Sequence, residues 1–307
     1  RLTLTFDLYN KITKNWLVKA PLEEVYGTNA PYINGGDIDN RGCEIAAGWR
    51  DHIGGLKYNI NANIAFNHNK VTRIDNSEGI IEGQYDFYGN NDTWYRAQVG
   101  YPIGYFYGYK TDGIFQTEAD VKAYVNPKTN KEIMPNAVPG DVKFVDLNGN
   151  GVIDSNDRTQ IGDPHPHYTY GITANLEYKG FDLSVTGIGV GGNQIADALD
   201  FSSIMDLYSN YTDAVLDRWH GPGTSNSYPR VVSGASINTQ YFSDLYMKSG
   251  AYFRISNVTL GYDFKQLFSA IPLRQIRFYI TIQNLYTFTK YSGMDPEVGY
   301  APDSWAQ

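Results

Sequence analysis

The stretch KYNINANIAFN, residues 57–67, alternates strictly between polar and apolar side chains. Successive side chains of a β-strand point to opposite faces, so a period of two predicts a strand with one wet face and one apolar face. The apolar set is Tyr58, Ile60, Ala62, Ile64 and Phe66, and the polar set is Lys57, Asn59, Asn61, Asn63 and Asn67.

Six further segments show the same alternation: 1–9, 42–51, 168–178, 181–190, 251–264 and 275–285. In 251–264 the phase slips between Ile255 and Val258, which predicts a β-bulge. The sequence therefore predicts an all-β fold.

The composition agrees with this fold class and excludes several functions. Of the 307 residues, 26 are Tyr and 31 are Gly, and charged residues make up only 19%, a mixture that favours β-structure over a helical enzyme. The net charge of −8 gives no basic surface for nucleic acid. The single cysteine, Cys43, excludes an internal disulfide framework. No apolar run reaches the 18 or more residues of a membrane-spanning helix, although membrane β-strands would escape this test.

The connections between the predicted strands are alternately long and short. The long ones are 10–41, 68–167 and 191–250, and the short ones are 52–56, 179–180 and 265–274. Short turns at one end and long loops at the other are typical of outer-membrane β-barrels. The alternative is a soluble β-protein with decorated loops. Seven strands cannot close a barrel without unpaired edges in lipid, so we expect the chain to be part of a larger barrel.

The stretch VDLNGNGVID, 145–154, has the spacing of a calcium loop. Ca²⁺ takes six to eight oxygen ligands, and the candidates at the matching positions are Asp146, Asn148, Asn150, Val152 (through its carbonyl), Asp154 and Asp157. Magnesium is a second candidate ion. A strand-like run precedes the loop and no helix follows it, so the alternative is an Asx-rich turn without an ion.

Three other clusters have both a functional and a structural interpretation. Aromatic faces with amides and carboxylates suit sugars, so Trp94, Tyr95, Asn90, Asn91 and Asp92 form the candidate substrate site, with loop packing as the alternative. GIGVGG at 187–192 matches a nucleotide-binding pattern, but the preceding strand is antiparallel, so we expect the glycines to let a strand bend. Asp295 and Glu297 could form a glycosidase pair, but they lie only two residues apart.

Five ordered segments together resemble the C-terminal part of SusC/RagA-type TonB-dependent transporters: 100–116, 139–164, 218–230, 249–264 and 278–299. The resemblance implies a fragment of a 22-stranded transmembrane antiparallel β-barrel with long extracellular loops, in the outer membrane of a Gram-negative bacterium. On this interpretation, residues 1–307 are the C-terminal portion of the barrel, and the plug domain and the final strand are absent.

The resemblance also implies a function without catalysis. It indicates TonB-dependent active import of oligosaccharides or peptides, together with a SusD-like lid lipoprotein and with TonB acting through the plug. A dimer of transporter–lid pairs is a further possibility, and the calcium loop would be a structural site in an extracellular loop. The competing hypothesis is a soluble, calcium-stabilised, β-rich glycan-binding module.

Overall fold

The computed structural model describes residues 1–307 apart from 20–31, 84–92, 198–209, 233–235, 269–271 and 299–307. The chain forms two compact units. The sheet unit comprises residues 1–72, 165–193 and 249–307, and the loop unit comprises residues 73–164 and 194–248.

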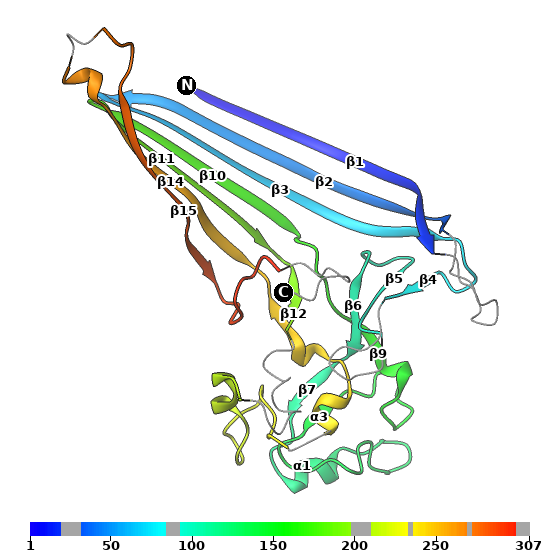
Figure 1. Ribbon diagram of the computed structural model, residues 1–307. Coiled ribbons are helices and arrows are strands. Elements are labelled where there is room, and N and C mark those ends of the chain that lie inside the picture. Colours follow the sequence, from blue (N-terminus) through cyan, green and yellow to red (C-terminus); the bar gives the residue numbers. More distant parts are fainter. Residues whose placement is uncertain (20–31, 84–92, 198–209, 233–235, 269–271, 299–307) are drawn as a thin grey trace. The chain divides into compact units, whose positions relative to one another are not determined.

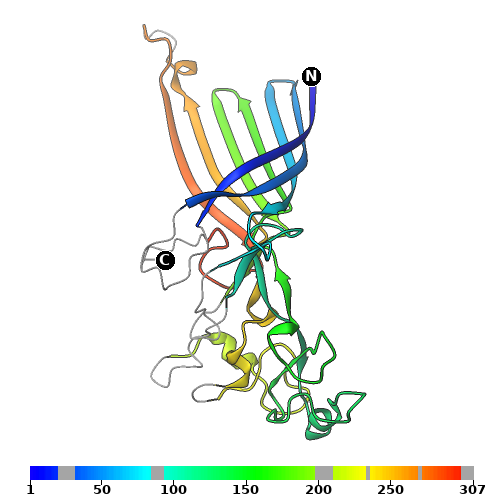
Figure 2. The same ribbon diagram turned by 90° about the vertical axis from the view of Figure 1, so that its right-hand side faces the viewer.

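The sheet unit contains a seven-stranded antiparallel sheet, shown in Figure 1. Its strands, in spatial order, are β1 (Leu2–Lys19), β2 (Tyr32–Ile53), β3 (Leu56–Ile74), β10 (Tyr168–Tyr178), β11 (Phe181–Gly191), β14 (Tyr252–Asp263) and β15 (Arg277–Thr289). The order of the strands across the sheet is the same as their order along the chain, and neighbouring strands are paired. All seven predicted strands are confirmed. Figure 2 shows the curvature of this sheet.

Short turns connect the strands at one end of the sheet, which we call the turn end. Gly54 lies in the turn between β2 and β3, and Lys179 and Gly180 form the turn between β10 and β11. All three residues have positive φ angles, which glycine adopts most readily and which are common in tight turns. The β14–β15 connection at this end carries the short helix η5 (Phe264–Gln266). Both insertions that make the loop unit leave from the opposite end, the loop end, so the predicted long connections 68–167 and 191–250 are confirmed.

Strands β1, β2 and β3 are longer than the sequence predicts. Residues 10–41 were expected to be a loop, but β1 continues to Lys19 and β2 begins at Tyr32. In these extensions the alternation is interrupted: Asn10 follows Leu8 on the otherwise apolar face, and the β1–β2 register shifts between Thr13 and Leu17. On the polar face Asn67 and Asn69 donate to Asn40. An interrupted alternation does not identify a strand, although the backbone hydrogen-bond ladder continues.

The loop unit is built from short strands around two hydrophobic clusters. One sheet has the order β4 (Ile80–Glu82), β5 (Tyr95–Gln98), β6 (Tyr105–Tyr109) and β9 (Arg158–Gly162). Two strand pairs are β7 (Thr111–Ile114) with β8 (Val142–Phe144), and β12 (Gln194–Ala196) with β13 (Met247–Ser249). The helices are α1 (Glu118–Ala123), η2 (Ser155–Asp157), η3 (Asp213–Asp217), α3 (Ile237–Gln240) and η4 (Asp244–Tyr246).

The two clusters give the loop unit its own core. One is centred on Phe106, Tyr228 and Phe242, and the other on Phe115, Val142 and Phe144. The first cluster contains side chains from both insertions. The second contains side chains of the first insertion, and residues of the second insertion pack against it, such as Tyr241, whose ring centroid lies 5.2 Å from that of Phe144. Within the described residues, no helix is both long enough and apolar enough to cross a membrane.

Candidate functional site

One face of the seven-stranded sheet is lined by uncharged polar side chains. Cross-strand pairing places them in rows across β3, β10, β11, β14 and β15; one row is Asn61, Thr173, Thr186, Asn257 and Gln283, and the next is Asn59, Asn175, Ser184, Thr259 and Thr281. Hydroxyl groups form hydrogen bonds within these rows, and Thr259 Oγ1 lies 3.0 Å from Thr281 Oγ1. This face offers hydrogen bonds with little charge.

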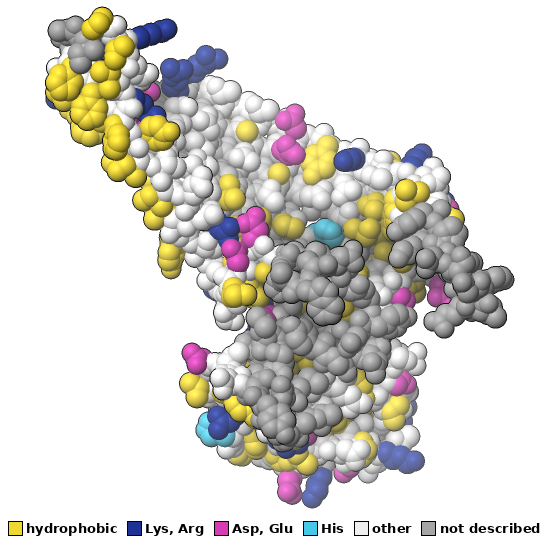
Figure 3. Space-filling view, viewed as in Figure 1, with side chains coloured by type: hydrophobic (Ala, Val, Ile, Leu, Met, Phe, Trp, Pro, Cys, Tyr) yellow, Lys and Arg dark blue, Asp and Glu magenta, His cyan; other side chains and the backbone are white. Residues whose placement is uncertain are grey.

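The opposite face is apolar and exposed. Its rows include Tyr58, Leu176, Leu183, Leu260 and Ile280, and Ile60, Ala174, Val185, Val258 and Ile282. Leu4, Leu260 and Ile280 are 67%, 51% and 60% exposed. Figure 3 shows hydrophobic side chains along the length of β15. A water-facing sheet that covers no core would not carry such a surface.

Aromatic side chains border this apolar face at both ends. At the turn end Tyr178, Phe181, Tyr262 and Phe278 form one row. Towards the loop end Phe66, Tyr168, Tyr170, Phe253 and Phe288 form a chain of neighbouring rings. The ten-residue step from Tyr168 to Tyr178 is about 34 Å along a strand, or about 26 Å across a membrane at a typical tilt of about 40°. That span matches the apolar band of outer-membrane barrels, which is about 25 Å tall.

A hollow of about 580 Å³ lies on the polar face of β1, β2 and β3. Thr3, Thr5, Asn59, Asn61 and Asn63 line it together with Arg1 and Arg50. The side-chain amides of Asn61 and Asn63 lie close to glycines of the neighbouring strands, where a larger residue would not fit. A Cβ on Gly48 would be 2.9 Å from Asn61 Oδ1, and one on Gly171 would be 2.9 Å from Asn63 Oδ1. A sheet that is polar on the hollowed side and apolar on the other is the wall of a transmembrane β-barrel.

Ion pairs lie at both ends of the polar face. Near the turn end, Arg277 donates two hydrogen bonds to Asp182, of 2.9 and 2.5 Å, and Lys57 lies 3.6 Å from Glu177. Near the loop end, Arg254 binds both Asp295 and Glu297. Asp295 and Glu297 were considered as a glycosidase pair, but both carboxylates bind the same guanidinium.

The predicted calcium loop is closed by its own backbone. Asp146 accepts hydrogen bonds from the N–H groups of Gly149, Asn150 and Gly151, at 2.7, 3.2 and 2.7 Å. Asn148 Oδ1 accepts from Asn150 N at 2.7 Å. These contacts form the turn that the Asx-rich alternative describes.

The second half of the loop holds the remaining candidate ligands. Asp157 is fully buried and accepts from the N–H groups of Leu147, Asn148 and Asp154, at 2.8, 3.2 and 2.9 Å. Asn150 Oδ1 accepts from Val152 N at 2.9 Å. The N–H of Asn156, 2.7 Å from Asp154 Oδ1, holds the pKa of Asp154 below its usual range.

The loop contains the oxygen donors that calcium prefers, yet its carboxylates are occupied by amide donors. Among the described residues, no three acidic, histidine or cysteine side chains converge as a metal centre requires. Calcium binding therefore stays a prediction for this loop.

The candidate substrate residues are only partly described. Asn90, Asn91 and Asp92 lie outside the described residues. The ring centroid of Trp94 lies 4.6 Å from that of Tyr95 and 6.1 Å from that of Phe106, on which it is stacked. Trp94 and Tyr95 are partly buried and pack against the cluster around Phe106. Their half-buried position supports the packing interpretation, and a role in substrate binding stays a prediction.

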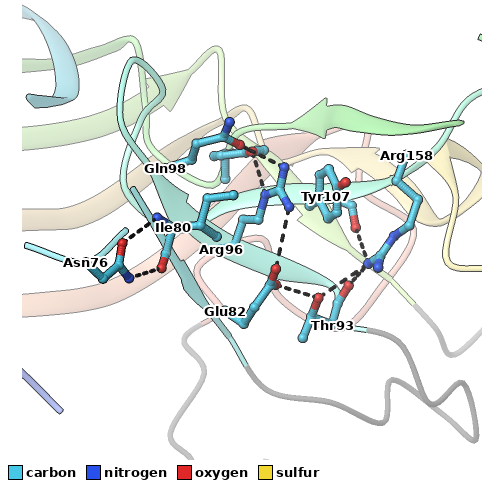
Figure 4. Close-up of polar contacts among 9 residues, drawn as sticks. Asn76, Ile80, Glu82, Thr93, Arg96, Gln98, Tyr107 and Arg158 are labelled. Carbon is cyan, nitrogen blue, oxygen red and sulfur yellow. Dashed lines mark hydrogen bonds and ion pairs between the residues drawn. The ribbon is translucent and has the colours of Figure 1, made fainter. Parts of the chain in front are cut away.

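Beside these aromatic residues lies a polar cluster that the sequence did not indicate, drawn in Figure 4. Arg96 lies over the ring of Tyr107, 3.3 Å from its centroid, and Arg158 lies 4.4 Å from the same centroid. Arg96 also donates to Gln98 at 2.8 Å, and Arg158 donates to the carbonyl oxygen of Thr93. These contacts join β5, β6 and β9, so we interpret the cluster as structural.

A buried ion pair joins the two insertions of the loop unit. The Asp141 carboxylate, 1% exposed, accepts from Arg230 Nε at 2.6 Å and from Asn238 Nδ2 at 3.2 Å. Asn238 Oδ1 in turn accepts from Val142 N at 2.8 Å. The arginine and the carboxylate are 89 residues apart, so no local pattern could indicate this contact.

The comparisons with known proteins agree with the barrel wall. No description of a protein family matches the chain. The TonB-dependent receptor P3 of Formosa agariphila is 30% identical over 310 residues, which are 99% of this chain and 30% of that receptor. The TonB-dependent receptor SusC of Bacteroides thetaiotaomicron is 28% identical over 312 residues, 97% of this chain and 28% of SusC.

Solved structures show the same fold. The RagAB peptide transporter matches with a TM-score of 0.74 at 20% identity, over 97% of this chain and 31% of that one. The RagAB peptide importer in its closed-closed state matches with a TM-score of 0.72.

The fold defines part of an outer-membrane β-barrel wall. By sequence and fold, the chain belongs to the SusC/RagA-type TonB-dependent receptors, a class of outer-membrane β-barrel proteins of Gram-negative bacteria. The chain spans about 30% of the length of the curated relatives that it matches.

Proposed function

We propose that this chain forms part of the wall of a TonB-dependent importer in the outer membrane of a Gram-negative bacterium. The two-faced sheet is the observation that carries the proposal. Its apolar face suits lipid, its polar face suits a water-filled path, and its outer strands β1 and β15 would pair with further strands of the barrel.

The cargo in this proposal is a hydrated oligomer, either an oligosaccharide or a peptide. The rows of Asn, Thr and Ser side chains support it because they can form hydrogen bonds with hydroxyl groups or with peptide amides without a strong preference for charge. The barrel wall would be passive, with TonB supplying the work through a plug and a SusD-like lipoprotein delivering the cargo. The names of the relatives, which are receptors and transporters, support a function without catalysis.

The test uses the whole receptor in its natural host. We expect the receptor in the outer-membrane fraction, and we expect that deleting it abolishes growth on a specific oligosaccharide or peptide mixture that the parent strain uses. Uptake should also stop when TonB is removed. A receptor recovered in the soluble fraction would instead support the competing hypothesis of a calcium-stabilised glycan-binding module.

A further inference from the structure

Arg254 on β14 is a nearly buried arginine on the polar face of the sheet, with its side chain 9% exposed. The predicted bulge, confirmed between Ile255 and Asn257, explains its orientation. Thr186 pairs with Asn257 on the polar face, and Ile188, two residues further along β11, pairs with Arg254. The extra residue, Ser256, therefore turns Arg254 to the polar face, where strict alternation would place it on the apolar face.

The guanidinium makes three directed contacts. Nη2 lies 2.6 Å from Asp295 Oδ1, Nη1 lies 2.6 Å from Glu297 Oε2, and Nε donates to Thr287 Oγ1 at 2.9 Å. Thr287 belongs to the neighbouring strand β15, whereas the two carboxylates belong to the segment that follows it. One side chain thus ties residues 291–298 back to the sheet. Figure 1 shows the chain turning after β15.

The segment is shaped to hold this position. The Glu297 N–H donates to Asp295 Oδ1 at 2.9 Å, and this donor, together with Arg254, holds the pKa of Asp295 below its usual range. Pro296 is buried between the two half-exposed carboxylates. Along β15 from Arg277 to Thr289, the side chains are exposed except Thr287, which is half-buried beneath the clamp.

We propose that Arg254 is a positioning residue that clamps residues 291–298 across the polar face, so that this segment forms part of the pathway wall and narrows it towards the loop end. The narrowing rests on the proposed import function, whereas the clamp itself does not. Both carboxylates of the segment are held by charge-assisted hydrogen bonds to one arginine of the sheet. This arrangement suits a fixed constriction rather than a catalytic site.

Proteolysis of the whole receptor in the outer membrane tests the clamp. Trypsin cleavage after Lys290, at the start of the segment, should become about tenfold faster in Arg254→Gln, because the segment loses its anchor. The matched control is Arg277→Gln, which removes a second arginine–carboxylate pair on the same face near the turn end. Its cleavage after Lys290 should be unchanged. Arg254→Lys should restore part of the protection, since it keeps the charge but not the three directed contacts.

Two measurements separate the clamp from a failure to fold and from a failure of the proposed function. The double variant Asp295→Asn/Glu297→Gln releases the segment without changing a strand and should match Arg254→Gln in cleavage. In uptake assays with the oligomer mixture that supports growth, both variants should shift the KM and favour larger oligomers, with unchanged amounts of folded receptor. Equal cleavage in Arg254→Gln, the double variant and the Arg277→Gln control would overturn the clamp. Faster cleavage with unchanged uptake selectivity would overturn the narrowing alone.

Discussion

Replacing Gly189 with alanine should destabilise the barrel wall more than most single-methyl changes. Gly189 faces the apolar side of β11, where a Cβ would lie 2.4 Å from Tyr170 Cζ and 2.6 Å from the carbonyl oxygen of Tyr252. The tyrosine ring could move, but the backbone carbonyl could not. Overpacking costs about 1–3 kcal/mol, and loss of the stacking of Tyr170 on Phe253, at 5.9 Å and 4°, adds about 0.5–1.5 kcal/mol. We therefore expect Gly189→Ala to cost about 1.5–4.5 kcal/mol.

Urea unfolding of the whole receptor in lipid vesicles, followed by heat-modifiable mobility on gels, measures this cost. Gly55→Ala is the matched control, because its Cβ would lie at an ordinary 3.4 Å from the ring of Tyr178. Adding Tyr170→Ala to Gly189→Ala should recover the part of the loss that comes from the ring, which a double-mutant cycle reports as coupling. A cost below about 0.5 kcal/mol, the range of neutral surface changes, would refute the reasoning.

Three further predictions concern the loop unit. Asp141→Ala should destabilise this unit by about 1–3 kcal/mol, because the buried Asn238 amide and the one-third exposed Arg230 both lose their acceptor, and faster proteolysis within the unit would show it. If calcium binds, Asp146→Ala should increase protease cleavage between residues 116 and 165 in the presence of calcium. Equal cleavage of the unchanged protein and the variant would show that the ion does not stabilise the loop. Because the folded-state pKa of Asp154 is lowered, its stabilising contribution is present above the usual carboxyl pKa and lost as the pH falls through the lowered value. The protection factor of the Asn156 amide, its exchange rate relative to that of an unstructured peptide at the same pH, should then fall only at acid pH, and Asp154→Ala should abolish that pH dependence.

Alternation was sufficient to predict all seven strands of the sheet because one face must suit lipid and the other water. The same logic explains where prediction failed. In residues 10–41 polar and apolar side chains are mixed on each face, with Asn10 opposite Arg41 on the otherwise apolar face, and the register shifts twice between Thr13 and Leu17. The periodic signal is therefore interrupted although β1 and β2 remain paired up to Lys19 and Tyr32. A strand that leaves the membrane keeps its backbone hydrogen bonds and loses only the pattern that identifies it.

The glycines of residues 187–192 show a different limit. They were expected to let a strand bend, but Gly187, Gly189 and Gly191 lie under the rings of Phe253, Tyr170 and Tyr168. Each ring comes from a neighbouring strand, so the reason for each glycine is a cross-strand contact. Sequence reasoning gave the correct element, but the register is needed to see what each glycine accommodates.

The calcium loop was predicted from residue types, and its outcome depends on what those types do in space. Asp146, Asn148 and Asp157 could serve either an ion or the backbone, because a carboxylate oxygen accepts equally well from an N–H group. The structure shows the backbone contacts. Oxygen spacing alone cannot distinguish a loop that an ion closes from one that its own amides close.

Four of the segments that carry the family resemblance bind one another in pairs. Segment 139–164 supplies Asp141 and segment 218–230 supplies Arg230, while segment 249–264 supplies Arg254 and segment 278–299 supplies its two carboxylates. Each arginine is nearly or partly buried against its acidic partner, so losing either side alone leaves an uncompensated charge. A change in one segment should therefore be tolerated only with a matching change in its partner. This mutual dependence gives a physical reason why segments so far apart in the chain should occur together.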